Sequence, residues 1–227
     1  MPKNRDRGRG QVTAVLLAAG SSSRMGRPKQ LLPIDGKPAI LWCAEALALQ
    51  KSHKVRELVI VTAKGSEGLE AAMEGLLALC RMKGLQVKIA VNDVMGSDMA
   101  GSVRAGLRMV SPVSSGVLVA LSDHPMVSAE TVEVLLERHM GKTPGNIIVP
   151  VHEGKRGHPA LFPRLFLDEF FQFRAGFFTL RDLVKKHEDE TVFLAVKDEG
   201  VTADMDTPED YLRIKALMEG RGLIYRR

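Results

Sequence analysis

Residues 17–30 combine small side chains with two cations, a combination that suits binding of a polyphosphate. The segment reads LAAGSSSRMGRPKQ and follows an apolar run. Small side chains let the backbone approach a ligand, and successive backbone N–H groups can form an anion-binding concavity. Arg24 adds a forked cation and Lys29 a point charge, which would neutralise a triphosphate as pyrophosphate departs. The same composition also suits a flexible turn with solvated cations, and its spacing matches neither of the common glycine-rich nucleotide motifs.

Two aspartates stand where a divalent cation could be bound. Asp123 follows the apolar run at 116–121, and Asp206 lies in the segment DMDTPED. Carboxylates bind Mg²⁺, which bridges phosphate oxygens and stabilises developing charge. Each position also has a structural explanation, because an aspartate after a strand is often part of a turn and Thr207-Pro208 predicts the start of a helix. The helix start alone does not require Asp206.

These residues must be positioned by a chain that alternates between short apolar runs and longer segments with helical periodicity. The expected strands are residues 12–19, 57–63, 87–91, 116–121 and 146–151. The expected helices are residues 38–50, 67–82, 101–110 and 129–140. Such alternation predicts a mainly parallel sheet with helices on both faces, which is a three-layer α/β/α fold. Because ligands collect beyond the carboxyl ends of the strands in these sheets, the loops after the strands are the expected site.

The domain organisation predicted from the sequence is simple. Residues 11–220 form a single domain, within which residues 151–187 make a looser, acceptor-side subdomain. Residues 1–10 are expected to be a disordered basic tail, and residues 221–227 a second basic tail. No internal repeat or linker marks a second full domain.

Composition narrows the class of function. Four of the first ten residues and three of the last seven are lysine or arginine, and they account for much of the net charge of +5. The charge therefore favours a small anionic ligand over nucleic acid. Because the chain has neither a run of eighteen apolar residues nor a secretory signal, no membrane span or export is expected. Cys43 and Cys80 form no paired motif, which favours a reducing compartment and the cytoplasm, and the six histidines show no zinc-ligand spacing.

The pattern LAAGxSSRMGxxKxLLP at residues 17–33 resembles the signature loop of MobA/MocA-type nucleotidyltransferases, which have a Rossmann-like GT-A fold. That family also includes the methylerythritol-phosphate cytidylyltransferases. The resemblance covers residues 12–218 and implies in-line transfer of a nucleoside monophosphate to an acceptor phosphate, without a covalent enzyme intermediate. It implies Mg²⁺ as cofactor, held by Asp123 and Asp206. The catalytic residues that it implies are Arg24, Lys29 and Asp123.

In that family the loop backbone contacts the base, while the cations hold the triphosphate. The resemblance therefore predicts ten nucleotide-binding residues: Leu17, Ala18, Ala19, Gly20, Ser21, Ser23, Arg24, Lys29, Asn92 and Ser102. Ala-Ala-Gly at 18–20 is typical of members that use CTP, whereas members that use GTP have Ala-Gly-Gly. Asp98, Ser122 and His124 depart from the family pattern, and Asp98 leaves GTP open as the donor.

Gly157-His158-Pro159 resembles the molybdopterin cytidylyltransferase branch in particular, where this tripeptide lies on the acceptor side. His158 and the neighbouring cations would then hold the terminal phosphate of molybdopterin. Without the resemblance, the segment is an exposed hairpin tip with a turn histidine. The alternatives are another acceptor, such as methylerythritol phosphate or a sugar phosphate, and a non-catalytic nucleotide-binding regulator. Hand-off of the product to a molybdenum hydroxylase is a hypothesis that rests on the family branch alone.

Overall fold

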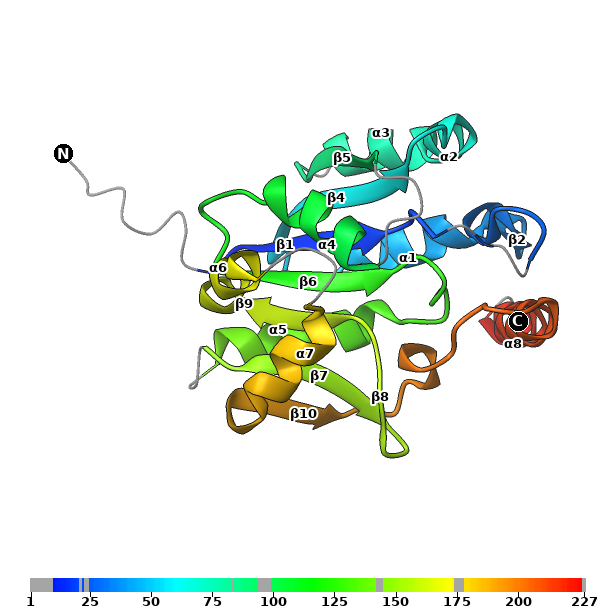
Figure 1. Ribbon diagram of the computed structural model, residues 1–227. Helices are drawn as coiled ribbons and strands as arrows, with labels where there is room; N and C mark the ends of the chain where they lie inside the picture. The colour runs from blue at the N-terminus through cyan, green and yellow to red at the C-terminus, as the bar shows by residue number, and fades with distance from the viewer. Residues whose placement is uncertain are drawn as a thin grey trace.

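One mixed sheet runs through the molecule (Figure 1). The computed structural model describes residues 10–20, 22, 25–82, 84–93, 99–141, 145–173 and 178–225. The strand order is β10-β7-β9-β6-β1-β4-β5, with β8 paired to β7. The strands are β1 (Val12–Leu17), β4 (Val55–Ala63), β5 (Gln86–Asn92), β6 (Gly116–Leu121), β7 (Ile147–His152), β8 (Lys155–Arg156), β9 (Ala160–Pro163) and β10 (Thr191–Ala195).

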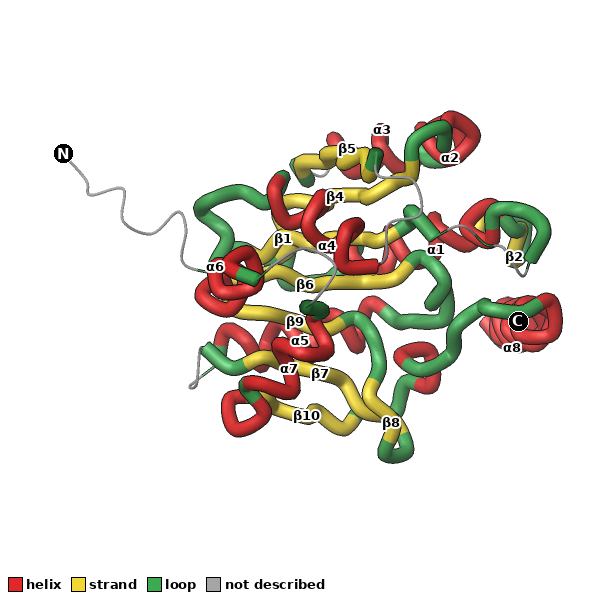
Figure 2. The backbone as a smooth tube through the Cα atoms, in the orientation of Figure 1, coloured by secondary structure: helices red, strands yellow, loops and turns green. Residues whose placement is uncertain are grey.

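The central strands are parallel. β1 pairs in parallel with both β4 and β6, and β5 pairs in parallel with β4. All six residues of β1 are buried, as expected for a parallel strand that is covered on both faces. β9 is antiparallel to its neighbours β6 and β7, a direction that the sequence pattern does not specify. The loops after β1, β4 and β6 consequently leave the same edge of the sheet (Figure 2).

Helices cover both faces of the sheet and confirm the three-layer α/β/α fold. One face carries α1 (Ala39–Ala48), α2 (Glu67–Ala72), α3 (Glu74–Met82) and α5 (Ala129–Met140). The other face carries α4 (Met99–Arg108), α6 (Arg164–Gln172) and α7 (Leu180–Lys186). Alternate residues of β1 pack into the two layers, since Leu16 belongs to the first apolar cluster and Val15 to the second. The helix expected over 67–82 is divided at Met73.

A third apolar cluster joins the C-terminal helix to the segment after the first loop. α8 (Pro208–Tyr225) packs against the small hairpin of β2 (Pro33–Ile34) and β3 (Lys37–Pro38). Tyr211 donates its hydroxyl to the carbonyl oxygen of Pro33 at 2.7 Å. Because α8 continues to Tyr225, part of the segment expected to be a C-terminal tail is helical.

Several smaller features bear on the sequence predictions. Cys43 and Cys80 are buried free thiols. In the described ranges, no helix has the length and apolarity needed to cross a membrane.

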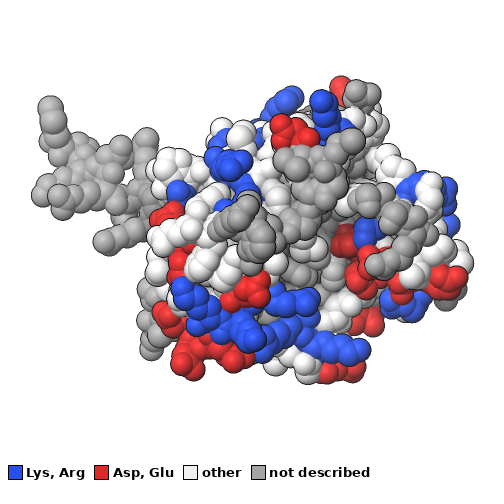
Figure 3. Space-filling model, viewed as in Figure 1, with Lys and Arg blue, Asp and Glu red and all other residues white. Residues whose placement is uncertain are grey.

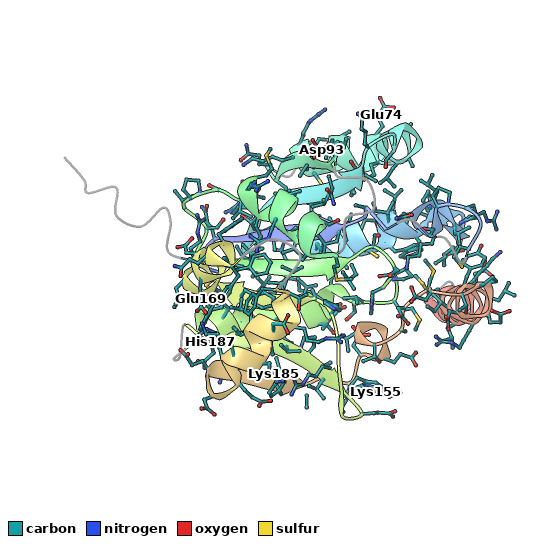
Figure 4. The ribbon with its side chains drawn as sticks, viewed as in Figure 1. Glu74, Asp93, Lys155, Glu169, Lys185 and His187 are labelled. Atoms are coloured by element: carbon teal, nitrogen blue, oxygen red, sulfur yellow. The ribbon has the colours of Figure 1, made fainter. Side chains whose placement is uncertain are left out.

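α6 and α7 are tied together by Glu169 and His187, whose side chains meet at 2.7 Å (Figure 4). Acidic and basic side chains are interspersed on the face shown in Figure 3.

Candidate active site

Lys29 joins the two aspartates that the sequence singles out. Its Nζ donates to Oδ2 of Asp123 at 2.6 Å and to Oδ1 of Asp206 at 2.8 Å. Burial by itself lowers the pKa of Lys29, but the two carboxylates outweigh that effect and hold the pKa above its ordinary value. Lys29 is therefore an ammonium at neutral pH, fixed between two carboxylates beside the edge where the parallel strands end.

The first loop is folded around Gln30, a buried residue that the sequence patterns did not single out. Its Nε2 donates to the carbonyl oxygens of Ala18 at 3.0 Å and Gly20 at 3.1 Å. Because a trans peptide places its C=O and N–H on opposite sides, the Ala19 N–H points away from Gln30. The Ser22 hydroxyl accepts the Lys29 N–H at 2.9 Å and so holds the loop to the short 3₁₀ turn η1 (Lys29–Leu31). One sequence signal could have revealed this role of Gln30: a polar side chain lies there between Lys29 and an apolar pair.

Three predicted loop residues, Ser21, Ser23 and Arg24, lie outside the described residues, as does Asp98. Asn92 and Ser102 are brought together. The Asn92 Nδ2 donates to the Ser102 Oγ at 2.9 Å, and both residues are buried. This bond joins the end of β5 to α4. Contact of these two side chains with a nucleotide stays a prediction.

Asp206 is placed by a backbone contact with the strand end that carries Asp123. The Met205 N–H donates to the Asp123 carbonyl oxygen at 3.0 Å. Directly after Asp206, Thr207 and Asp210 exchange side-chain-to-backbone hydrogen bonds at 3.1 and 3.2 Å. This reciprocal cap starts α8, as the Thr-Pro signal predicts. Asp206 takes no part in the cap, and its carboxylate is directed to Lys29.

Gly157-His158-Pro159 lies against the interior of the protein. The His158 N–H donates to the Val201 carbonyl oxygen at 2.8 Å, and a Cβ on Gly157 would lie only 2.3 Å from that oxygen. His158 Nδ1 is buried without a hydrogen-bond partner in the described part of the chain. Burial lowers the pKa of His158 to about 4, and the neighbouring His124 adds to the shift. The imidazole is therefore neutral at pH 7, and its contact with an acceptor phosphate stays a prediction.

His124 lies between Asp123 and His158. Its ring is 5.7 Å from that of His158, and its Nε2 is 3.8 Å from Oδ1 of Asp123. Its Nδ1 lies 3.3 Å from the Gly200 carbonyl oxygen, to which it must act as the donor because a carbonyl only accepts. Both histidines, together with Cys43, line a cavity of about 10 Å³.

The donor set fits a divalent cation that is shared with a substrate. Asp123 and Asp206 offer carboxylate oxygens close together, because both bind the Lys29 ammonium. The second oxygen of Asp123, Oδ1, is buried and has no hydrogen-bond partner in the ranges that the structure describes. Over the same ranges there is no cluster of three or more ligating side chains. Mg²⁺ is commonly held by one or two carboxylates plus substrate phosphates, which matches this arrangement.

Comparison with known proteins agrees with the fold. The family model described as the MobA-like NTP transferase domain matches residues 14–191. Nicotine blue oxidoreductase of Paenarthrobacter nicotinovorans is 30% identical over 212 residues, covering 89% of this chain and 96% of that protein. The 2-C-methyl-D-erythritol 4-phosphate cytidylyltransferase of Endomicrobium trichonymphae is 30% identical over 127 residues, or 55% of this chain and 52% of its own length.

Solved structures show the same architecture. Rv0371c of Mycobacterium tuberculosis superposes with a TM-score of 0.72 at 27% identity, covering 92% of this chain and 97% of the other. A nucleotidyl transferase from Methanothermobacter superposes with a TM-score of 0.73 at 21% identity, covering 93% of this chain and 99% of the other. The chain therefore belongs to the family of MobA-like NTP transferase domains and is an enzyme of the nucleotidyltransferase type.

Proposed function

We propose that this enzyme transfers CMP from CTP to the terminal phosphate of molybdopterin and releases pyrophosphate. The observation that carries the proposal is the convergence of Asp123 and Asp206 on the Lys29 ammonium, directly beside the Ala18–Gly20 turn. CTP as donor is supported by Ala-Ala-Gly in that turn and by similarity to a protein named as a cytidylyltransferase. Molybdopterin as acceptor is supported by the resemblance of Gly157-His158-Pro159 to one branch of the family.

The reaction needs positioning and charge neutralisation more than acid–base chemistry. An ionised oxygen of the acceptor phosphate forms a bond to the α-phosphorus of CTP. The opposite bond, to the oxygen that bridges the α- and β-phosphates, breaks, and its electron pair leaves with pyrophosphate. Lys29, held in place by Asp123 and Asp206, supplies a fixed positive charge to the phosphates, and Arg24 is expected to supply another. No general base is needed because the acceptor phosphate is already ionised at neutral pH.

Mg²⁺ is the proposed cofactor, with Asp123 and Asp206 as its protein ligands. When bound, such an ion neutralises charge on the phosphate oxygens and polarises the reacting phosphorus. A structure of Rv0371c, which is 27% identical to this chain, is described as a complex with manganese. Mn²⁺ is therefore the natural substitute in binding measurements. A cytoplasmic location and a hand-off to a molybdenum hydroxylase also stay predictions.

One comparison favours a second candidate reaction. The relative that matches 89% of this chain is named nicotine blue oxidoreductase, so the same scaffold is associated with a redox reaction in that protein. The Lys29–Asp123–Asp206 arrangement favours phosphate chemistry, because a fixed ammonium between carboxylates is suited to a polyphosphate and its cation. Enzyme-dependent reduction of nicotine blue by an added electron donor distinguishes the two candidates.

The test is a screen for pyrophosphate release with Mg²⁺ and each of CTP, GTP, ATP and UTP. Each nucleotide is combined in turn with molybdopterin, methylerythritol phosphate, a sugar phosphate and no acceptor. We expect release that requires both CTP and molybdopterin. Release with another acceptor or with GTP would replace that part of the proposal. Reduction of nicotine blue without any pyrophosphate release would overturn it in favour of the second candidate.

A further inference from the structure

We propose that Asp198 is a positioning residue for the Asp123–Asp206 pair. The hydrogen-bond partners of the Asp198 side chain in the described part of the chain are Ser128, Thr131 and Gly200. Asp198 acts through the backbone segment that follows it, residues 199–206, which ends at Asp206. The inference extends the proposed function, because it concerns how the chain sets its affinity for the divalent cation.

The Asp198 carboxylate joins two segments that are distant in the sequence. Its Oδ2 accepts hydrogen bonds from the Ser128 N–H at 2.9 Å, the Ser128 hydroxyl at 2.9 Å and the Thr131 hydroxyl at 2.7 Å. Its Oδ1 accepts from the Gly200 N–H at 2.9 Å. The carboxylate therefore ties the loop between β6 and α5, which contains Asp123, to the 3₁₀ turn η3 (Glu199–Val201).

This tie adds to the cap of α5 and does not replace it. The N-cap of α5 is Ser128, whose Oγ accepts the Thr131 N–H at 3.1 Å. That bond is the usual cap and does not involve Asp198. The three further bonds from Ser128 and Thr131 to Asp198 consequently serve to hold η3 against the loop.

The loop and η3 are in direct backbone contact at the point that Asp198 secures. A Cβ on Gly200 would lie 2.4 Å from the carbonyl carbon of Met126, so only glycine allows this approach. The His124 ring lies against the same place, since its Nδ1 donates to the Gly200 carbonyl oxygen at 3.3 Å. Both contacts are made by residues that follow Asp123 within three positions.

The far end of the segment is held by a backbone bond, from the Met205 N–H to the Asp123 carbonyl oxygen at 3.0 Å, and by the Met205 side chain, which is fully buried in the third apolar cluster. The side chain of Asp206 is 42% exposed, whereas that of Asp123 is 16% exposed. Packing of the Asp206 side chain therefore does little to fix its position, which depends on the backbone before it and on the Lys29 ammonium at 2.8 Å. A change at Asp198 that loosens η3 is expected to reach Asp206 through this segment.

The experiment compares Asp198→Asn with the matched control Asp182→Asn. Asp182 also caps a helix, accepting the Thr179 N–H at 2.9 Å and the Thr179 hydroxyl at 2.7 Å, but it lies on α7 and has no tie to the site. Mn²⁺ binding is measured by electron paramagnetic resonance in the presence of CTP. Partners that orient metal ligands typically change metal affinity by about 10–100-fold, so we expect Asp198→Asn to weaken Mn²⁺ binding by about 10-fold or more and Asp182→Asn to leave it within about twofold.

A second measurement keeps the inference separate from the proposed function. Amide hydrogen exchange of Met205, in protein without metal, is expected to speed up in Asp198→Asn and to stay unchanged in Asp182→Asn. The milder Thr131→Val, which removes one donor to Asp198, should shift both readouts in the same direction and serves if Asp198→Asn does not fold. Unchanged Mn²⁺ affinity with unchanged Met205 exchange would overturn the inference. If the unaltered enzyme binds no Mn²⁺, the proposed cation role fails and Met205 exchange alone decides the role of Asp198.

Discussion

The backbone N–H of Met205 donates a hydrogen bond to the carbonyl oxygen of Asp123 across 3.0 Å. Because Met205 directly precedes Asp206, this bond brings two carboxylates from distant parts of the chain to one place. Their charges repel each other, and the Lys29 ammonium at 2.6 and 2.8 Å offsets that repulsion. A divalent cation with a bound polyphosphate would therefore enter a site whose charges are already organised.

Gln30 should be important for binding of the nucleotide and unimportant for binding of the acceptor. Gln30→Leu removes the amide that holds the carbonyl oxygens of Ala18 and Gly20, leaving them without a partner. We expect a loss of about 1–3 kcal/mol in stability, the usual cost of an unpaired buried polar group. The KM for CTP should rise by about 10-fold while the KM for the acceptor is unchanged, as measured by initial rates of pyrophosphate release.

Gln50→Leu is the matched control for this variant. Gln50 is also buried and donates its amide to the Leu47 carbonyl oxygen at 3.1 Å, but it lies beyond the end of α1. It should lose stability without any change in the KM for CTP. Equal KM values in the two variants would show that Gln30 supports the fold and not the loop.

Gly200 should tolerate no side chain. A Cβ there would lie 2.4 Å from the Met126 carbonyl group, so Gly200→Ala forces the two backbone segments apart. We expect the free energy of unfolding to fall by about 1–3 kcal/mol and the activity to be weaker. Gly75→Ala is the control, because Gly75 lies in α3 with nothing within 4 Å of the place that a methyl group would take, and alanine favours the helix by roughly 1 kcal/mol. Denaturant unfolding measures the stability of both variants. A Gly200→Ala variant as stable as the unaltered protein would contradict the close packing.

His158 should make the protein less stable in acid. Its pKa in the folded protein, about 4, is below the ordinary value of about 6.5, so folding favours the neutral imidazole. This contribution is fully present above pH 6.5 and is lost as the pH falls toward 4, because only the unfolded chain binds the proton readily. The full effect amounts to roughly 3 kcal/mol. His139, whose pKa burial also lowers, should act in the same direction.

Urea unfolding at pH 7, 6, 5 and 4.5 measures this dependence. The unaltered protein should lose stability over the range, and His158→Gln should lose clearly less. Parallel curves for the two proteins would mean that the imidazole is not buried in its neutral form.

The parts of the site that the sequence predicts are those with a local signal. Lys29 follows the apolar run at 12–19, and Asp123 follows the run at 116–121. Asp206 precedes a Thr-Pro helix start. Each residue could therefore be assigned to a loop after a strand. The parallel central strands could also be predicted, because apolar runs alternate with helical segments along the sequence. The three-layer fold was predictable because the apolar runs and the helical periodicity are both local features of the sequence.

The parts that the sequence could not reveal depend on contacts between distant segments. Nothing near His158 indicates that its N–H pairs with Val201 or that its ring lies beside His124. The tie between Asp198 and Ser128 likewise joins residues 70 positions apart. The direction of β9 is set by its place between β6 and β7, which its own four residues do not encode. Such features arise only when the sheet is assembled.

The most direct test of the central claim is pyrophosphate release from CTP and molybdopterin by Asp123→Asn and by the control Glu188→Gln. Asp123→Asn keeps the side-chain volume but removes the charge that faces Lys29, whereas Glu188 makes an exposed ion pair with Arg156 at 2.9 Å. We expect kcat to fall by about 100-fold or more in Asp123→Asn and to show no measurable change in Glu188→Gln. Unaltered turnover in Asp123→Asn would contradict the assignment of the Lys29–Asp123–Asp206 arrangement as the active site.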